Sequence, residues 1–128
     1  MITVENKKGN ILIVDHNKKT NFTLSKILKK EGHWVGFTHN LNKAMDILNK
    51  KGINIVLTEV GMPGSDGMTL LREIKKIKPA VQVVMMTDNG NMDSYLEAME
   101  LGAFEYFNKP IKNKILCKAI QKALVDSN

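Results

Sequence analysis

Polar side chains follow four apolar runs of the chain, at the points where each run gives way to a loop. Asp15 and His16 follow one run, Glu59 and Thr87 follow two others, and Lys109 follows a short fourth. If the runs are parallel strands, these side chains meet at the carboxyl edge of one sheet, where open α/β folds bind ligands. Two carboxylates, an imidazole, a hydroxyl and an ammonium together favour a site for charged groups. The competing interpretation is that strand ends are simply solvated.

The stretch 53–67, INIVLTEVGMPGSDG, is the one around which the rest of the chain is organised. It opens as an apolar, β-branched run, which is typical of a strand buried on both faces. It closes in glycine, proline, serine and aspartate, which favour a turn. Glu59 stands at the change from strand to loop, so we expect its carboxylate at the functional edge.

The elements that must position these residues alternate between strand and helix five times. Strands are predicted at 10–14, 34–38, 53–59, 81–87 and 104–107, and helices at 18–31, 41–51, 68–78, 92–101 and 112–124. Such alternation predicts a parallel sheet covered on both faces through right-handed crossovers, a three-layer doubly wound α/β domain. We expect a flexible tail over residues 1–9 and one domain over residues 10–125.

Helical spacing also predicts which side chains each helix buries. For the first, third and last helices the predicted buried side chains are Phe22, Leu24, Ile27, Leu28, Leu70, Leu71, Ile74, Ile77, Ile115, Leu116, Ala119, Ile120 and Ala123. Asn40 is the predicted N-cap of the second helix.

The composition of the 128 residues is that of an ordinary globular protein. The single cysteine, Cys117, fits a reducing compartment and a small core residue. No apolar run approaches the ~20 residues that span a membrane, and the first residues lack the apolar region of a signal peptide. These observations predict a cytoplasmic protein that does not enter a membrane.

Four segments resemble response-regulator receiver domains of two-component systems, over residues 11–124. They are ILIVD, the loop with Met62-Pro63 and Asp66-Gly67, MMT, and LGAFEYFNKP. The resemblance implies a five-stranded parallel sheet in the flavodoxin-like order 2-1-3-4-5. It also implies a signalling module rather than an enzyme, working in a phosphorelay with a histidine kinase or another signalling protein.

In the resembled family a phosphoryl group moves from a kinase histidine to an aspartate beside Mg²⁺. The resemblance implies that Glu59 occupies the acceptor position and that Asp15 and His16 occupy the acidic pair. The metal would then be held by Asp15, Glu59 and the carbonyl of Gly61. Thr87 and Lys109 would bind the phosphoryl oxygens, as implied by position.

The same resemblance implies that Tyr106 is the aromatic residue that changes rotamer on activation.

Two departures from the family pattern act against the phosphoryl-transfer chemistry. Glu59 is one methylene longer than aspartate, and misplacement on that scale can cost ~100-fold in rate. His16 puts an imidazole where Mg²⁺ prefers oxygen, so Mg²⁺ binding is expected to be weakened.

The expected function is therefore that of an atypical receiver, a pseudo-receiver that acts through protein contacts without phosphorylation. Glu59 either imitates the phosphorylated state by reaching towards Thr87 and Lys109, or forms a simple ion pair with Lys109. The alternatives are a receiver that still accepts phosphate with Mg²⁺, and a basic module that binds nucleic acid.

The net charge of +6 must be placed before it is interpreted. Lysines at predicted helix C-termini are explained by the helix dipole. Nucleic-acid binding is disfavoured because Arg72 is the one arginine and no binding motif is present. The last two helices, 93–101 and 112–124, carry an acidic stripe of Asp93, Glu97 and Glu100 and a basic stripe of Lys114, Lys118 and Lys122. These stripes predict a weak homodimer, with solvated helix faces as the alternative.

Overall fold

The computed structural model describes residues 6–62 and 65–126. The first five residues of the predicted tail and two residues of the predicted loop, Pro63 and Gly64, lie outside this part of the chain. The main sheet consists of β1 (Asn10–Val14), β2 (Trp34–Thr38), β3 (Ile55–Glu59), β6 (Gln82–Thr87) and β7 (Glu105–Asn108). The helices are α1 (Lys18–Lys30), α2 (Leu41–Lys50), α3 (Gly67–Ile77), α4 (Met92–Glu100) and α5 (Asn113–Asp126).

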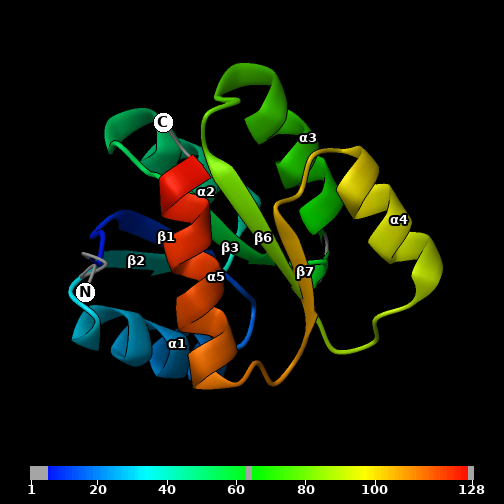
Figure 1. Ribbon diagram of the computed structural model, residues 1–128. Helices are drawn as coiled ribbons and strands as arrows, with labels where there is room; N and C mark the ends of the chain where they lie inside the picture. Colours follow the sequence, from blue (N-terminus) through cyan, green and yellow to red (C-terminus); the bar gives the residue numbers. More distant parts are fainter. Residues whose placement is uncertain (1–5, 63–64, 127–128) are drawn as a thin grey trace.

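The five strands are parallel and lie in the order β2-β1-β3-β6-β7. Counted along the main sheet, this is the predicted order 2-1-3-4-5, so the doubly wound, flavodoxin-like fold is confirmed. Helices α1 and α5 cover one face of the sheet, and α2, α3 and α4 cover the other (Figure 1). The central strand β3 is buried along its whole length, as its apolar sequence predicts.

A small antiparallel pair lies between β3 and α3 where only a turn was predicted. It joins β4 (Gly61–Met62) to β5 (Ser65–Asp66). The helix that follows begins close against β3, since a Cβ on Gly67 would lie 2.0 Å from the backbone oxygen of Glu59. Only glycine permits this approach, and strands of two residues are too short to leave a periodic pattern in the sequence.

Three of the predicted core side chains are exposed, which corrects the assignment of helix faces. Phe22 is 64% exposed, Ile77 is 49% exposed and Ile115 is 47% exposed. In α1 the buried positions are Asn21, Leu24, Ser25 and Leu28, which fit one stripe of 3.6-residue period. Phe22 follows Asn21 directly, so it lies about 100° around the helix from that stripe. The buried face of α1 thus includes two polar residues, Asn21 and Ser25, which a search for apolar residues alone does not find.

The predicted cap of α2 is present, and glycines end two of the helices. The side chain of Asn40 accepts a hydrogen bond from the backbone N–H of Lys43 at 2.8 Å, so the predicted N-cap of α2 is confirmed. Gly32 ends α1 and Gly102 ends α4, with φ of 96° and 99°. Such left-handed conformations favour glycine after a helix. Within residues 6–62 and 65–126, no helix is long and apolar enough to cross a membrane.

Residues 7–9, which were assigned to a flexible tail, make hydrogen bonds to the domain. The backbone N–H of Lys7 donates to Gln121 Oε1 at 2.9 Å, and that of Gly9 donates to His33 Nδ1 at 3.1 Å. The N–H of Trp34 donates to the carbonyl of Gly9 at 3.1 Å. This segment therefore extends the start of β1 alongside β2.

His33 gives this contact a pH dependence. Its burial, and next the Lys8 ammonium, lower the pKa of the His33 imidazole below 6.5, while Glu31 opposes them. The unfolded chain therefore binds the proton more tightly, so this group's contribution to stability is complete above pH 6.5 and declines as pH falls through the lowered pKa. His33→Gln is expected to make the pH dependence of the free energy of unfolding shallower between about pH 7.5 and 5.5. Urea unfolding at several pH values measures this free energy, and His39→Gln, at an exposed position, is the control. Equal slopes in wild type and His33→Gln would contradict this prediction.

Candidate functional site

Two carboxylates are brought together because β1 and β3 are neighbours in the sheet. Val14 is paired with Thr58, so the residues that follow, Asp15 and Glu59, lie side by side at the carboxyl edge. Asp15 is 0% exposed and Glu59 is 2% exposed. Buried carboxylates require compensating charges or hydrogen bonds, so their partners decide what this site can do.

His16 supplies the contacts of Glu59. Glu59 Oε2 accepts a hydrogen bond from the backbone N–H of His16 and lies 2.7 Å from His16 Nδ1. The imidazole lies farther from Asp15, at 3.7 Å between Nδ1 and Oδ1. The extra methylene of glutamate is what lets Oε2 reach both groups of one residue. His16 thereby holds the Glu59 side chain on the β1 side of the site.

Lys109 is the cation of the site, and its nearest partner is Asp15. Lys109 Nζ lies 2.6 Å from Asp15 Oδ2 but 3.8 Å from Glu59 Oε1. The contact with Asp15 is an ion pair without hydrogen-bond geometry. Asp15 Oδ2 accordingly has no hydrogen-bond partner among the described residues. The expected Glu59–Lys109 ion pair is present, but it is the longer of the two contacts, since Glu59 is held by His16.

Burial dominates the electrostatics of Glu59. Desolvation raises the pKa of the Glu59 carboxyl, the backbone N–H of His16 opposes this by favouring the anion, and Asp15 adds to the increase. Lys109 faces three carboxylates, because Asp88 Oδ2 also lies 3.9 Å from its ammonium. A pocket with more carboxylate than ammonium attracts a further cation or proton rather than an anion.

Thr87 and Gly61 lie near Glu59 without bonding to it. All three line a hollow of about 290 Å³ together with residues of the loop after β6. Thr87 Oγ1 accepts a hydrogen bond from the backbone N–H of Asn89 at 3.2 Å, so the hydroxyl serves its own loop. The structure thus gathers the predicted hydroxyl and carbonyl beside the carboxylate, and it leaves room between them.

Tyr106 belongs to a separate contact in this structure. Its hydroxyl is hydrogen-bonded to Ser94 Oγ of α4, and its ring meets Tyr95 edge to face with centroids 5.6 Å apart. Tyr106 also packs against the core on the α3–α4 side of the sheet. Ser94 lines the same hollow as Glu59 and Thr87, so the predicted aromatic switch is linked to the site through α4.

Sequence reasoning missed two residues of this site. Asp88 directly follows Thr87, and its carboxylate lies beside Lys109. It follows a predicted strand, which is the same signal that identified Asp15, Glu59 and Lys109. Ser94 lies inside α4 and reaches the hollow only because that helix packs beside β7. A polar residue on an exposed helix gives no such signal in sequence.

Asp15, His16 and Glu59 are the described residues of this site whose ligand atoms lie close enough to share a metal ion. One ligand atom from each of Asp15, His16 and Glu59 lies within 4.8 Å of the others. Mg²⁺ takes oxygen ligands in near-octahedral geometry, whereas here an imidazole nitrogen stands in the set. Both carboxylates are also already engaged, one by Lys109 and one by His16. This donor set does not fit Mg²⁺.

The chain matches the family of response regulator receiver domains over residues 11–121. It is 34% identical to sporulation initiation phosphotransferase F of Bacillus subtilis (strain 168) over 114 residues, which are 89% of this chain and 92% of that protein. It is 29% identical over 118 residues to the DNA-binding transcriptional regulator NtrC of Proteus hauseri, covering 92% of this chain. It spans only 25% of the length of that regulator.

A solved structure gives the same answer for the fold. The receiver domain protein from Clostridium thermocellum superimposes with a TM-score of 0.86 at 33% identity, covering 91% of this chain and 94% of that one. Nearly the whole described domain is therefore shared with these proteins, including the strand ends that carry the site.

Proposed function

This chain belongs to the response regulator receiver domain family, and we propose that it is an atypical receiver whose contacts with partners do not depend on phosphorylation. The family's role is regulatory, in two-component signal transduction. The proposal places Glu59 at the position of the phosphoacceptor aspartate and His16 at the second position of the acidic pair. The carrying observation is the Glu59–His16 contact, at 2.7 Å between Oε2 and Nδ1.

That contact acts against phosphorylation in two ways. It holds Glu59 Oε2 at His16, so that this oxygen is not free to attack phosphorus, and it engages the imidazole that replaces an acidic ligand. Asp15 is meanwhile occupied by the Lys109 ammonium. A carboxylate must be correctly positioned and charge-compensated to attack phosphorus, since phosphoryl transfer depends almost entirely on positioning and electrostatics.

The contacts of Glu59 favour a side chain fixed to His16 over one that imitates the phosphorylated state. Imitation requires its carboxylate near Thr87 and Lys109, but its closest contacts are both with His16, and Lys109 is 3.8 Å away. One planar carboxylate is also a poor copy of a phosphate group. The Glu59–His16 contact supports one fixed state of the site, in which the Tyr106 hydroxyl is hydrogen-bonded to Ser94.

The proposed partner is a histidine kinase or another signalling protein. A hollow of about 440 Å³ between α1 and the start of α5 opens beside the site, lined by Thr20, Ile27, Lys109, Pro110 and Ile111 among others. Its mixture of apolar and polar walls suits a partner's side chain. A phosphate-accepting receiver and a nucleic-acid-binding module remain the alternatives. The test of the proposal is phosphotransfer from a small-molecule donor with Mg²⁺, in the wild type and in variants that restore the family's carboxylates.

A weak homodimer through α4 and α5 is part of the proposal. Both charged stripes are exposed, and so are Leu96 and Ile115, which lie beside them on the two helices. A two-fold axis would set the acidic stripe of one copy against the basic stripe of the other. Exposed ion pairs contribute little, so the apolar side chains supply affinity and the charges supply register.

Light scattering over a concentration series at low salt is expected to show this dimer, and Lys118→Glu is expected to abolish it. Glu97 is engaged by Arg72 of its own chain at 3.1 Å, so Glu100→Lys is the better compensating change. Combined with Lys118→Glu, it should recover part of the association. Lys76→Glu on α3 is the control of equal charge. A wild type that remains monomeric at every concentration would refute the dimer.

A further inference from the structure

The excess positive charge of the chain lies in its first third. Residues 6–51 contain ten lysines against three acidic residues, Asp15, Glu31 and Asp46, whereas residues 52–126 contain nine basic and nine acidic residues. Asp15 is buried and paired with Lys109, so it does not offset the surface lysines. The net charge therefore belongs to α1, β2, α2 and the segments around them, rather than to the molecule as a whole.

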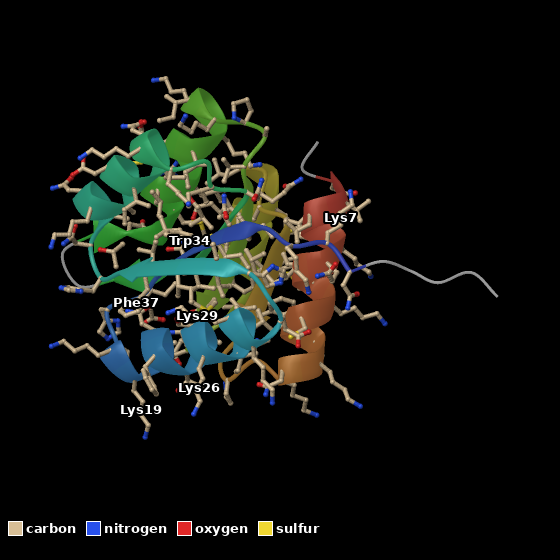
Figure 2. The ribbon with its side chains drawn as sticks, turned by 90° about the vertical axis from the view of Figure 1, so that its left-hand side faces the viewer. Lys7, Lys19, Lys26, Lys29, Trp34 and Phe37 are labelled. Atoms are coloured by element: carbon tan, nitrogen blue, oxygen red, sulfur yellow. The ribbon has the colours of Figure 1, made fainter. Side chains whose placement is uncertain are left out.

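One side of α1 carries both charge and an exposed aromatic ring. Lys19, Phe22, Lys26 and Lys29 are three and four residues apart, so they form one stripe along the helix. Figure 2 shows Lys19, Lys26 and Lys29 along α1, on the same side of the molecule as Trp34 and Phe37 of β2. The neighbouring side of α1, with Thr20, Thr23 and Ile27, lines the hollow towards α5, and Lys19 stands at the border between the two sides.

Strand β2 is an end strand of the sheet, and its outer edge is open. The N–H of Trp34 donates to Gly9, and the N–H of Asp15 donates to the carbonyl of Thr38, each at 3.1 Å. Residues 34, 36 and 38 therefore turn their backbone groups towards β1. By alternation, Val35 and Phe37 turn theirs outwards, and among the described residues these groups have no partner.

Exposed aromatic rings stand on both faces of this edge. Val35 packs into the core beneath α1 and α5, so Phe37, two residues on, lies on that face and is 50% exposed. Trp34 lies on the other face, 41% exposed, with its ring over Gly36, where a Cβ would come within 2.7 Å. Lys51 Nζ lies 4.6 Å from the centre of that ring. Each face thus offers an aromatic surface with lysines near it.

We propose that this basic edge, formed by β2, the Lys19–Lys29 stripe of α1 and Lys51, binds an acidic, extended segment of a partner protein. The segment adds to β2 as a further strand and bonds to the outward backbone groups of Val35 and Phe37. Its side chains alternate between the two faces of the sheet, as those of any strand do. Apolar side chains then contact Trp34 and Phe37, and carboxylates reach the lysines on both faces.

The arrangement favours a peptide over other occupants. A second copy of β2 would bring two sets of lysines together, which is repulsive. A single nucleic-acid strand stacks its bases on one continuous platform, whereas these rings lie on opposite faces of the sheet. Lysines at an open strand edge can simply prevent edge-to-edge aggregation. Here, however, the exposed side chains of Phe22, Trp34 and Phe37 beside the edge favour association, so prevention of aggregation does not explain the arrangement.

The test uses a fluorescein-labelled ten-residue peptide in which pairs of glutamates alternate with pairs of valines, so that each face of the bound strand carries both carboxylates and apolar side chains. We expect saturable binding by fluorescence anisotropy at low salt, with the largest ¹⁵N amide shifts at Val35 and Phe37. The same peptide with lysine in place of glutamate should not bind. A peptide methylated at every backbone nitrogen keeps its charges but has no N–H to donate from either edge of the strand, so it should also fail.

Matched variants separate the backbone from the side chains. Phe37→Ala removes only the ring, while Phe37→Pro also removes the outward N–H and is tolerated at an edge strand. Phe37→Pro should weaken binding about five-fold beyond Phe37→Ala, as one lost hydrogen bond implies. Lys26→Glu with Lys29→Glu should weaken it about five-fold, and the control of equal charge, Lys76→Glu with Lys112→Glu, less than about two-fold.

Several outcomes would overturn the proposal. These are the absence of peptide binding, equal binding of the methylated peptide, and equal effects of the two charge-reversed pairs. Tighter binding of an oligothymidylate, or of vesicles rich in phosphatidylserine, would assign the edge to nucleic acid or to membrane instead. None of these measurements involves Glu59 or phosphorylation, so the result stands apart from the proposed function. If Phe37→Pro does not fold, the methylated peptide decides the role of the backbone.

Discussion

Incubation of the wild-type protein with acetyl phosphate and Mg²⁺ is expected to leave its intact mass unchanged. The Glu59 carboxylate is engaged by His16 and the Asp15 carboxylate by Lys109, so both carboxylates that would hold the metal are occupied. Glu59→Asp alone is expected to recover little, because His16 still provides nitrogen where Mg²⁺ needs oxygen. His16→Asp alone leaves the attacking carboxylate one methylene too long.

The double variant, Glu59→Asp with His16→Asp, is expected to restore Mg²⁺ binding and phosphorylation together. Its rate should exceed that of wild type by ~100-fold or more, the scale on which misplacement of a reacting group by about an ångström acts. The matched control is Glu59→Gln with His16→Asp, which restores the acidic pair but offers no nucleophile. Mass spectrometry of peptides then assigns the added phosphoryl group to residue 59.

Two results would separate the parts of this account. A gain of one phosphoryl mass on the wild-type protein, mapped to the pocket, would show a working receiver and overturn the proposed function. If Glu59→Asp alone reacts as fast as the double variant, the glutamate explanation stands and the role given to His16 is wrong. A double variant that folds and binds Mg²⁺ yet does not react would place the obstacle outside these two residues.

Lys109→Met is expected to destabilise the protein by about 3–5 kcal/mol, the usual cost of leaving a buried charge without its partner. Asp15 is fully buried, and the Lys109 ammonium at 2.6 Å is its nearest cation. Methionine keeps most of the side-chain volume, so the loss measures charge rather than packing. Urea unfolding gives the free energy. Lys112→Met, at an exposed position three residues along, is the control and should change it by less than about 0.5 kcal/mol.

Double-mutant cycles identify the partner of Lys109. With Asp15→Asn the effects of the two substitutions should be strongly non-additive, with a coupling of about 1–3 kcal/mol. With Glu59→Gln the coupling should be smaller, because Nζ lies 3.8 Å from that carboxylate and His16 holds it. A larger coupling with Glu59 than with Asp15 would reverse the assignment, and additive effects in both cycles would remove Lys109 from the electrostatics of the site.

The sequence patterns alone were enough for the parallel sheet and the edge that carries the site, and the resemblance to receiver domains supplied the strand order. Strands such as Ile11–Val14 and Val83–Met86 are continuous apolar runs, and they are separated by helical patterns that end in glycine or before proline. These signals depend only on neighbouring residues, so they can be recognised without the fold. Because all strands run one way, the residues after them had to meet at one edge, and Asp15, Glu59 and Lys109 do.

Tertiary structure decided which of these residues bond to which. Glu59 and Lys109 are at the expected edge, but a difference of about an ångström makes Asp15 the ion-pair partner and His16 the contact of Glu59. Composition likewise gave the net charge of +6 but not its location beside an open strand with exposed Trp34 and Phe37. Pairing and exposure depend on distances between segments far apart in the chain. Packing sets those distances, so a local pattern could not reveal them.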